Sequence, residues 1–162
     1  DIGGLRVMSK KVIVDADACP GKNIIIEVCE EAGVALILVA SYAHEISAPS
    51  WVEVRKVDCH PQAVDILVSN LTAAGDVVIT QDWGLAAICL AKGAACLAPD
   101  GKQYDDSRMT AMLEIRNASA RWRRGGGRTR GPAARTARDD LYLENSLRKE
   151  LGLPSKASSD GF

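Results

Sequence analysis

The chain of 162 residues lacks long apolar runs, is poor in aromatic residues and contains only two histidines. Its longest apolar stretches, such as Val34–Ala40, are far shorter than the ~20 residues that a membrane-spanning helix requires. The start of the chain does not follow the basic, apolar and small-residue pattern of a signal peptide. These absences argue against an integral membrane or secreted protein, and we expect a cytoplasmic one.

Cysteines are five in number and show no Cys-x-x-Cys pair or other metal-binding spacing. Most of them lie inside apolar runs, so we interpret them as buried free thiols in a reducing compartment. Cys19 differs because it lies beside Asp17 between a strand and a helix. A nucleophilic cysteine needs a nearby base, however, and neither His44 nor His60 has a spacing that suggests one.

Charge is nearly balanced overall but not along the chain. The formal net charge is −1, with 47% apolar and 25% charged residues, which is typical of a globular protein. Residues 1–115 nevertheless carry a net charge of −7, whereas residues 116–162 carry +6. An acidic body joined to a basic C-terminal segment is the first indication of function.

The length is sufficient for one domain and short for two. We place this domain at residues 8–154, with Met8 as the natural start and residues 1–7 foreign to the native chain. An Arg/Gly-rich loop is expected within it at residues 124–135. Residues 155–162 are expected to form a disordered tail.

Apolar, β-branched segments alternate with helical patterns along most of the chain. The first helix is predicted to begin at Pro20 and to end at Ala32, where Gly33 stops it. The expected strands are 11–15, 34–40, 51–57, 76–80 and 94–98. The expected helices are 20–32, 61–74, 82–92, 107–123 and 136–151. Near-continuous apolar strands joined by helices predict an α/β fold, with a mainly parallel sheet of about five strands and helices on both faces.

Acidic residues gather where the predicted strands end. Asp15 and Asp17 end the first strand, Asp82 follows the fourth, and Asp65 lies in the first turns of a helix at the same edge. Asp58 is a less certain neighbour after the third strand. Ligands of open parallel sheets bind at the carboxyl ends of strands, so we expect these carboxylates to converge there.

Converging carboxylates repel one another unless a cation resolves the repulsion. A set of oxygen ligands suits Mg²⁺ or Mn²⁺, and such an ion could activate a water and stabilise the leaving oxygen of a phosphodiester. We therefore predict Mg²⁺ or Mn²⁺ as a cofactor, with Asp15, Asp17, Asp65 and Asp82 as both metal ligands and catalytic residues.

Each of these residues also has a purely structural interpretation. Asp82 and Asp17 precede helices and could act as N-caps, and Asp65 could complement a helix dipole. Thr80 could form a local hydrogen bond within its strand. Asp15 is harder to explain in this way because it ends an apolar strand and has no helix end of its own.

Several segments resemble the YaiI/YqxD family of bacterial proteins. The most specific is the nine-residue block Val-Ile-Val-Asp-Ala-Asp-Ala-Cys-Pro at 12–20. Further matching segments are residues 62–65, 75–86 and 92–94, and Gly131, Pro132, Thr136 and Asp139. The resemblance covers about residues 12–151.

That family is similar to PIN- and NYN-type nuclease domains, which implies a three-layer PIN-like fold and RNA hydrolysis with Mg²⁺ or Mn²⁺. The resemblance implies that Asp15 is the acid of the first strand and Asp82 the acid of a Thr-x-Asp motif, with Asp17 and Asp65 completing the ring. Two departures matter. Gln62 stands where some relatives have an acid, and Asp140 stands where many have an arginine.

Eight arginines lie within residues 116–138, with no acidic residue among them. Arginine binds phosphates in a bidentate manner and stacks on bases, so this segment suggests contact with nucleic acid. The alternative is a solvated loop without a partner. The predicted substrate-binding residues are Ser41, Thr80, Arg121, Arg123, Arg124, Arg128 and Arg130.

Three hypotheses follow from the same carboxylates and arginines. The first is a divalent-metal-dependent phosphodiesterase or ribonuclease with RNA as its partner. The second is a non-catalytic nucleic-acid or nucleotide-binding module, and the third is a hydrolase for a small phosphorylated molecule. The sequence leaves the choice among them open, together with the oligomeric state.

Overall fold

The computed structural model describes residues 10–17, 19–60, 62–107, 109–110, 114–115 and 134–156. Its elements are β1 Lys11–Asp15, α2 Lys22–Ala32, β2 Ala35–Ser41, β3 Glu53–Val57, α3 Ala63–Leu71, β4 Val77–Ile79, α4 Trp83–Ala91, β5 Ala95–Leu97 and α6 Ala137–Glu150. Most of the expected helix 107–123 and of the loop 124–135 lies outside the described residues.

The five strands form one sheet in the order β3-β2-β1-β4-β5, and all named strand pairs are parallel. In the register, Ile13 of β1 is paired with Ile37 of β2 on one side and with Val78 of β4 on the other. The chain runs outward from β1 in one direction through β2 and β3, and in the other through β4 and β5. The carboxyl ends of β1 and β4 therefore form the topological switch point where such sheets bind ligands.

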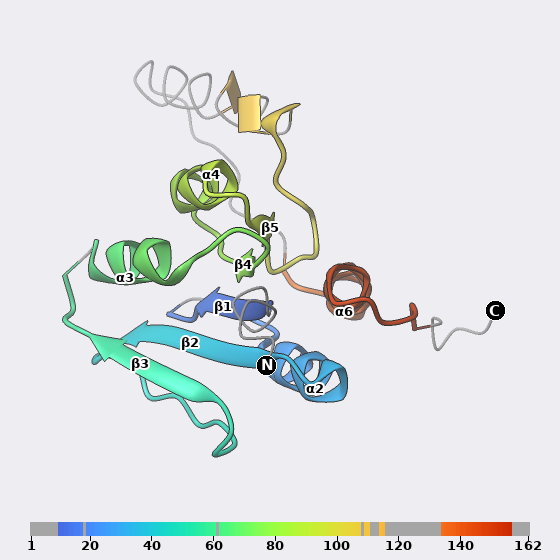
Figure 1. Cartoon of the computed structure of the whole chain (residues 1–162), viewed down its shortest axis with the longest axis horizontal. Coiled ribbons are helices and arrows are strands. Elements are labelled where there is room, and N and C mark those ends of the chain that lie inside the picture. The colour runs from blue at the N-terminus through green and yellow to red at the C-terminus, as the bar shows by residue number, and fades with distance from the viewer. Residues whose placement is uncertain are drawn as a thin grey trace, which may run out of the picture.

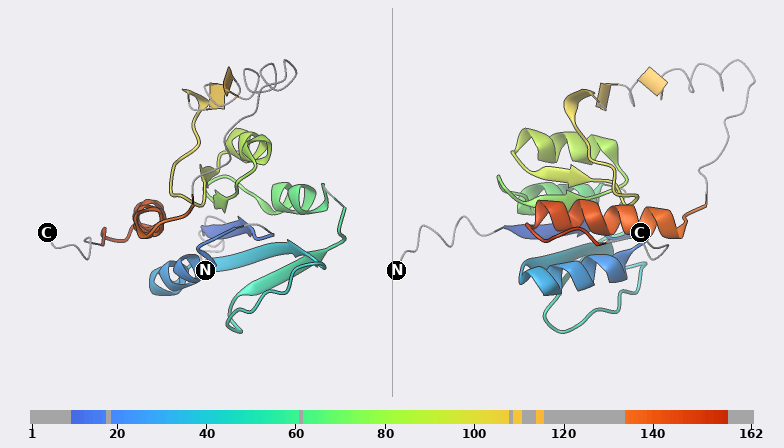
Figure 2. Two further views of the ribbon diagram at one scale, coloured as in Figure 1. Left: turned by 180° about the vertical axis from the view of Figure 1, so that it is seen from behind. Right: turned by 90° about the vertical axis from the view of Figure 1, so that its right-hand side faces the viewer.

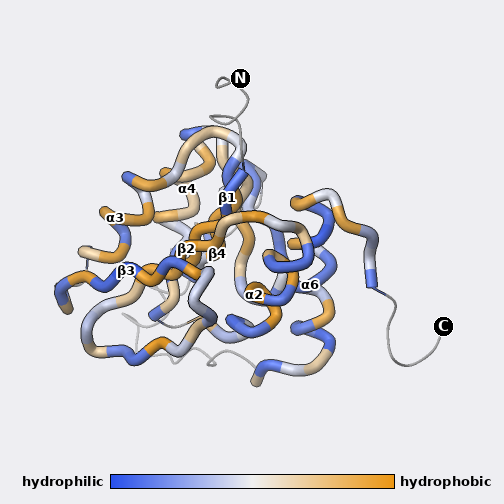
Figure 3. The backbone as a smooth tube through the Cα atoms, turned by 60° about the horizontal axis from the view of Figure 1, so that its bottom comes forward, coloured by the Kyte–Doolittle hydropathy of each residue, from blue (hydrophilic) through white to orange (hydrophobic). Residues whose placement is uncertain are grey.

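Helices cover both faces of the sheet, which confirms the predicted three-layer α/β fold (Figure 1). Helices α2 and α6 pack side by side on one face, and α3 and α4 lie on the other (Figure 2). Each face has its own hydrophobic core: Ile25 and Leu147 contribute to the first, and Val68 and Leu85 to the second. Figure 3 shows the hydrophobic residues concentrated in the central strands. None of the helices in the described residues has the length and hydropathy needed to cross a membrane.

Most helix ends follow the sequence signals, with differences at α2 and α3. Thr136 caps α6 in a reciprocal capping box with Asp139, as expected for an N-cap. Helix α2 begins at Lys22 rather than at Pro20, because Gly21 precedes it in the left-handed conformation. Helix α3 ends at Leu71 rather than at residue 74, because the backbone turns extended at Thr72.

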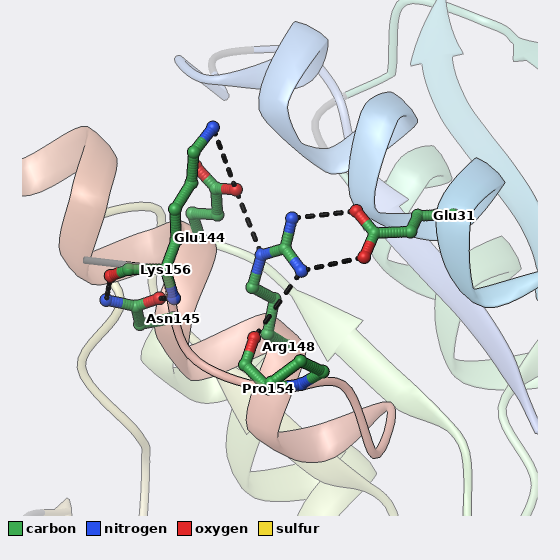
Figure 4. A network of polar contacts seen from close by, with 6 residues as sticks. All are labelled: Glu31, Glu144, Asn145, Arg148, Pro154 and Lys156. Atoms are coloured by element: carbon green, nitrogen blue, oxygen red, sulfur yellow. Dashed lines mark hydrogen bonds and ion pairs between the residues drawn. The ribbon is translucent and has the colours of Figure 1, made fainter.

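The C-terminal helix α6 is fixed to α2 by a network around Arg148 (Figure 4). The guanidinium of Arg148 donates two hydrogen bonds to Glu31 of α2, at 2.8 and 3.0 Å, and one to Glu144 of its own helix at 3.0 Å. Leu143 and Leu147 beneath it are fully buried. Helix α6 is therefore an integral layer of the fold and holds its first turn near the carboxyl edge of the sheet.

A close backbone contact also fixes α6. Gly101, with φ +90°, lies so near the helix that an added Cβ would be 2.6 Å from the backbone carbon of Tyr142. We expect Gly101→Ala to lower the free energy of unfolding by about 2–3 kcal/mol, since the new methyl group overlaps backbone that cannot rotate away.

Gly75→Ala is the matched control, because Gly75 has a similar φ of +89° but open space around the added Cβ. Backbone strain alone should cost this variant about 1 kcal/mol. Urea unfolding of both variants measures the difference, and equal losses would contradict the close approach of Gly101 to α6.

Candidate functional site

The four predicted aspartates line one cavity of about 420 Å³ at the carboxyl edge of the sheet. Asp15 is the last residue of β1, and Asp17 follows it. Asp65 lies in the first turn of α3, and Asp82 is the N-cap of α4. Asp58 is exposed and is not among the residues that line this cavity.

Thr80 connects the carboxylate of Asp15 to the backbone of Asp82. Its hydroxyl donates to Asp15 Oδ2 at 2.9 Å and accepts from the backbone N–H of Asp82 at 3.0 Å. The side chain is completely buried. In this arrangement Thr80 positions Asp15 and Asp82 relative to each other instead of reaching a substrate itself.

Asp17 is held by the end of β2. Its Oδ1 accepts from the backbone N–H of Ser41 at 2.7 Å, and His44 Nδ1 lies 3.1 Å from the same oxygen. The proposed cap on the first helix is wrong for this residue, because the N-cap of α2 is Gly21 and no side chain caps it. Ser41, which was predicted to bind substrate, lines the cavity and also orients Asp17 through its backbone N–H.

Asp82 has the capping role that was considered for it. Its Oδ1 accepts from the backbone N–H groups of Gly84 at 2.8 Å and Leu85 at 3.2 Å. Capping occupies Oδ1, and the carboxylate still lines the cavity. The structural and the functional interpretations of Asp82 are therefore compatible.

Burial and the crowding of the carboxylates raise the pKa values of two of these residues. Burial, with the neighbouring charges of Asp17 and Asp82, raises the pKa of Asp15 above its usual 3.8, although the Thr80 hydroxyl opposes this shift. The pKa of Asp65 is raised to about 6 by burial, by the charges of Asp82 and Asp15, and by a hydrogen bond to Asp82. A site that raises the pKa of its acids is one that a cation would stabilise.

Two histidines and a cysteine at this site were not predicted. His60 and Cys59 line the cavity, and His44 contacts Asp17 at its rim. Their positions in the sequence could have indicated this. His44 follows the end of β2, and Cys59 and His60 follow the end of β3, at the same edge of the sheet. His44 does not form a proton relay between Ser41 and Asp17, since both lie within 3.2 Å of the same ring nitrogen, Nδ1.

The donor set fits a hard divalent ion held partly through water. Among the described residues, no three His, Cys, Asp or Glu side chains are arranged to close around one ion. Mg²⁺ is commonly bound by one or two carboxylates, with water completing its shell. Asp15 and Asp82, joined through Thr80, are the pair best placed to supply such ligands.

Residues 13–152 match the family model described as "Uncharacterized BCR, YaiI/YqxD family". The chain belongs to this family. It is 45% identical over 139 residues to a UPF0178 protein of Heliobacterium modesticaldum, covering 85% of this chain and 93% of the relative. It is 38% identical over 149 residues to a UPF0178 protein of Clostridium novyi, covering 92% and 99%. No solved structure shows significant similarity to the chain.

Three of the segments that resemble the YaiI/YqxD family meet at this cavity. The block at 12–20 supplies Asp15 and Asp17, the segment 62–65 supplies Asp65, and the segment 75–86 supplies Asp82. Segments far apart in the sequence thus contribute acids to one place in the fold.

One departure from the YaiI/YqxD pattern has a structural explanation. Asp140 accepts a hydrogen bond from Arg135 Nε at 2.6 Å, while Arg135 Nη1 donates to the carbonyl of Pro99 at 2.7 Å. Asp140 therefore fixes Arg135 between α6 and the loop after β5. The arginines predicted to bind substrate, Arg121, Arg123, Arg124, Arg128 and Arg130, lie outside the described residues.

The raised pKa of Asp65 gives a pH prediction. Between pH 4 and 6 the folded protein binds more protons at this residue than the unfolded chain does, so the free energy of unfolding falls as pH rises through this range. With EDTA at pH 7, we expect Asp65→Asn to be more stable than the wild type, by at most about 1 kcal/mol because solvent screens this partly exposed group.

Urea unfolding at pH 4 and pH 7 measures this difference. The advantage of Asp65→Asn should vanish at pH 4, where Asp65 of the folded wild type is protonated. Asp58→Asn, an exposed acid outside the cavity, serves as the control and should change little. An Asp65→Asn variant that is less stable than the wild type at pH 7 would contradict electrostatic crowding at the site.

Proposed function

We propose that this protein is a divalent-metal-dependent phosphodiesterase that hydrolyses RNA. The observation that carries the proposal is the cavity that four carboxylates share at the switch point of the sheet, two of them with raised pKa values. Crowding several acids together is unfavourable for folding alone. It becomes favourable when a cation is bound, and Mg²⁺ or Mn²⁺ matches the oxygen donors.

The four carboxylates have two different roles in this proposal. Asp15 and Asp82 hold the ion, directly or through water, because Thr80 fixes them relative to each other. Asp17, oriented by Ser41, and Asp65 would serve as further ligands of the ion or would position its water. When bound, the metal ion supplies acidification of a coordinated water and neutralisation of charge on the phosphate.

RNA as the substrate rests on charge and on the resemblance to PIN- and NYN-type domains. An acidic cavity without a cation would repel a polyanion. The arginine-rich segment 116–138 supplies positive charge for the phosphate backbone, and a bound divalent ion offsets the carboxylates.

A non-catalytic nucleic-acid-binding module is the second candidate. It is favoured by the structural roles of two aspartates. Asp82 caps α4, and Asp17 accepts a hydrogen bond from the backbone N–H of Ser41. Such a module would bind RNA in a salt-dependent manner. It would not cleave RNA, whichever divalent ion is added.

Cleavage of single-stranded RNA tests the first candidate. We expect activity with Mg²⁺ or Mn²⁺ and none in EDTA, with a loss of about 100-fold or more in Asp15→Asn and in Asp82→Asn. Both substitutions preserve shape, and asparagine is itself a good N-cap, so Asp82→Asn removes charge without removing the cap on α4.

The matched control is Asp58→Asn, which should retain wild-type activity because Asp58 does not line the cavity. Cleavage that survives both Asp15→Asn and Asp82→Asn would refute the catalytic assignment. Salt-dependent RNA binding without cleavage would support the binding module instead.

Metal binding can be measured without any substrate. Mg²⁺ or Mn²⁺ at about 100 times its dissociation constant should stabilise the fold by about 2.7 kcal/mol at pH 7, because the ion binds the folded state alone. Thermal unfolding with and without the ion provides the measurement. The double variant Asp15→Asn/Asp82→Asn should show no such stabilisation, and an equal response in the double variant would place the ion elsewhere.

A further inference from the structure

The ring of His60 is fixed beside the cavity by the backbone that enters α3. The ring nitrogen Nδ1 accepts a hydrogen bond from the N–H of Gln62 at 3.2 Å, and the backbone carbonyl of His60 accepts one from the N–H of Ala63 at 3.0 Å. An amide N–H only donates, so Nδ1 must be the nitrogen without a proton. The remaining ring nitrogen, Nε2, therefore carries the hydrogen.

His44 has the opposite arrangement. Its Nδ1 lies 3.1 Å from Oδ1 of Asp17, and an ionised carboxylate only accepts hydrogen bonds. Nδ1 of His44 therefore carries the hydrogen. The only two histidines of the chain thus occur at one site in different tautomers, with Nε2–H in His60 and Nδ1–H in His44.

The tautomer of His60 decides what this side chain can bind. A ring nitrogen that carries a hydrogen has no lone pair for a metal ion, so Nε2 of His60 is a hydrogen-bond donor and not a metal ligand. The ring is exposed and lines the cavity together with the four aspartates. It contributes a donor to a wall whose other titratable groups are mainly acceptors.

We propose that His60 is a phosphate-binding residue whose Nε2–H donates to a non-bridging oxygen of the substrate phosphodiester. This inference rests on the proposed function, because it is the metal at the carboxylates that would bring a phosphate into the cavity. The position of His60 supports it, since the ring precedes the first turn of α3, where backbone N–H groups favour anions. Within one cavity, His60 then binds the phosphate of the substrate, and the aspartates bind the metal ion.

The tautomers can be observed directly. Long-range ¹H–¹⁵N spectra of the imidazole rings distinguish protonated from unprotonated nitrogens, and His44→Gln assigns the two rings because the chain has no third histidine. At a pH where the rings are neutral, we expect Nε2–H for His60 and Nδ1–H for His44. The Nδ1–H form in His60 would overturn the proposal.

Substitution tests the phosphate contact. In His60→Leu, which lacks a donor, we expect the dissociation constant for a single-stranded oligoribonucleotide in Ca²⁺ to rise about 10-fold. In His60→Gln, whose amide N–H reaches the position of Nε2, it should stay within about threefold. Mn²⁺ affinity measured without oligonucleotide should be unchanged in both variants, which a metal ligand would not allow.

The outcomes separate this proposal from the proposed function. Oligonucleotide binding that is lost in His60→Leu and retained in His60→Gln supports the phosphate contact, even if the wild type cleaves nothing in Mn²⁺ and the hydrolase is thereby refuted. Unchanged binding in His60→Leu overturns the contact, whether or not RNA is cleaved. Lost Mn²⁺ affinity in His60→Leu, or a wild type that binds no oligonucleotide, overturns it as well.

Discussion

Electrostatic repulsion among four carboxylates is the constraint on which the candidate site depends. Parallel pairing of β1 with β4 brings Asp15 and the start of α4 to the same edge, and the packing of α3 adds Asp65. Backbone N–H groups and the Thr80 hydroxyl offset part of this repulsion. Burial, together with the remaining repulsion, raises the pKa values of Asp15 and Asp65. The fold therefore keeps an unfavourable charge arrangement at the place where a divalent ion would make it favourable.

Local sequence patterns predicted the elements well because this fold consists of short, strongly apolar strands separated by helices with clear end signals. The acids could be placed together because each lies near a strand end, and the ends of parallel strands share one edge. Helix ends were less certain: α3 ends at Leu71 because the backbone becomes extended at Thr72, which a hydropathy pattern does not reveal. Nothing in the sequence showed that Gly101 touches the backbone of α6.

The functional details missed in the sequence are those that depend on contacts between distant residues. Asp17 was considered as a cap for its own helix, yet it binds the backbone of Ser41, 24 residues later. His60 was considered only as a partner for Cys19, and its relation to the cavity depends on how β3 leads into α3. Asp140 marked a departure from the family pattern, and its role became clear only from its bond to Arg135. Membership of the YaiI/YqxD family identifies relatives and leaves the chemistry to be determined from such contacts.

The Thr80 hydroxyl has a consequence for the entropy of ligand binding. It bonds Asp15 at the end of β1 and the backbone of Asp82 at the start of α4, and it has no contact with solvent. Asp82 in turn is held by the first turn of its helix. The two carboxylates are thus immobilised as one preorganised unit before any ion arrives. An incoming cation does not need to order them, so little of its binding free energy is consumed in restricting side-chain motion.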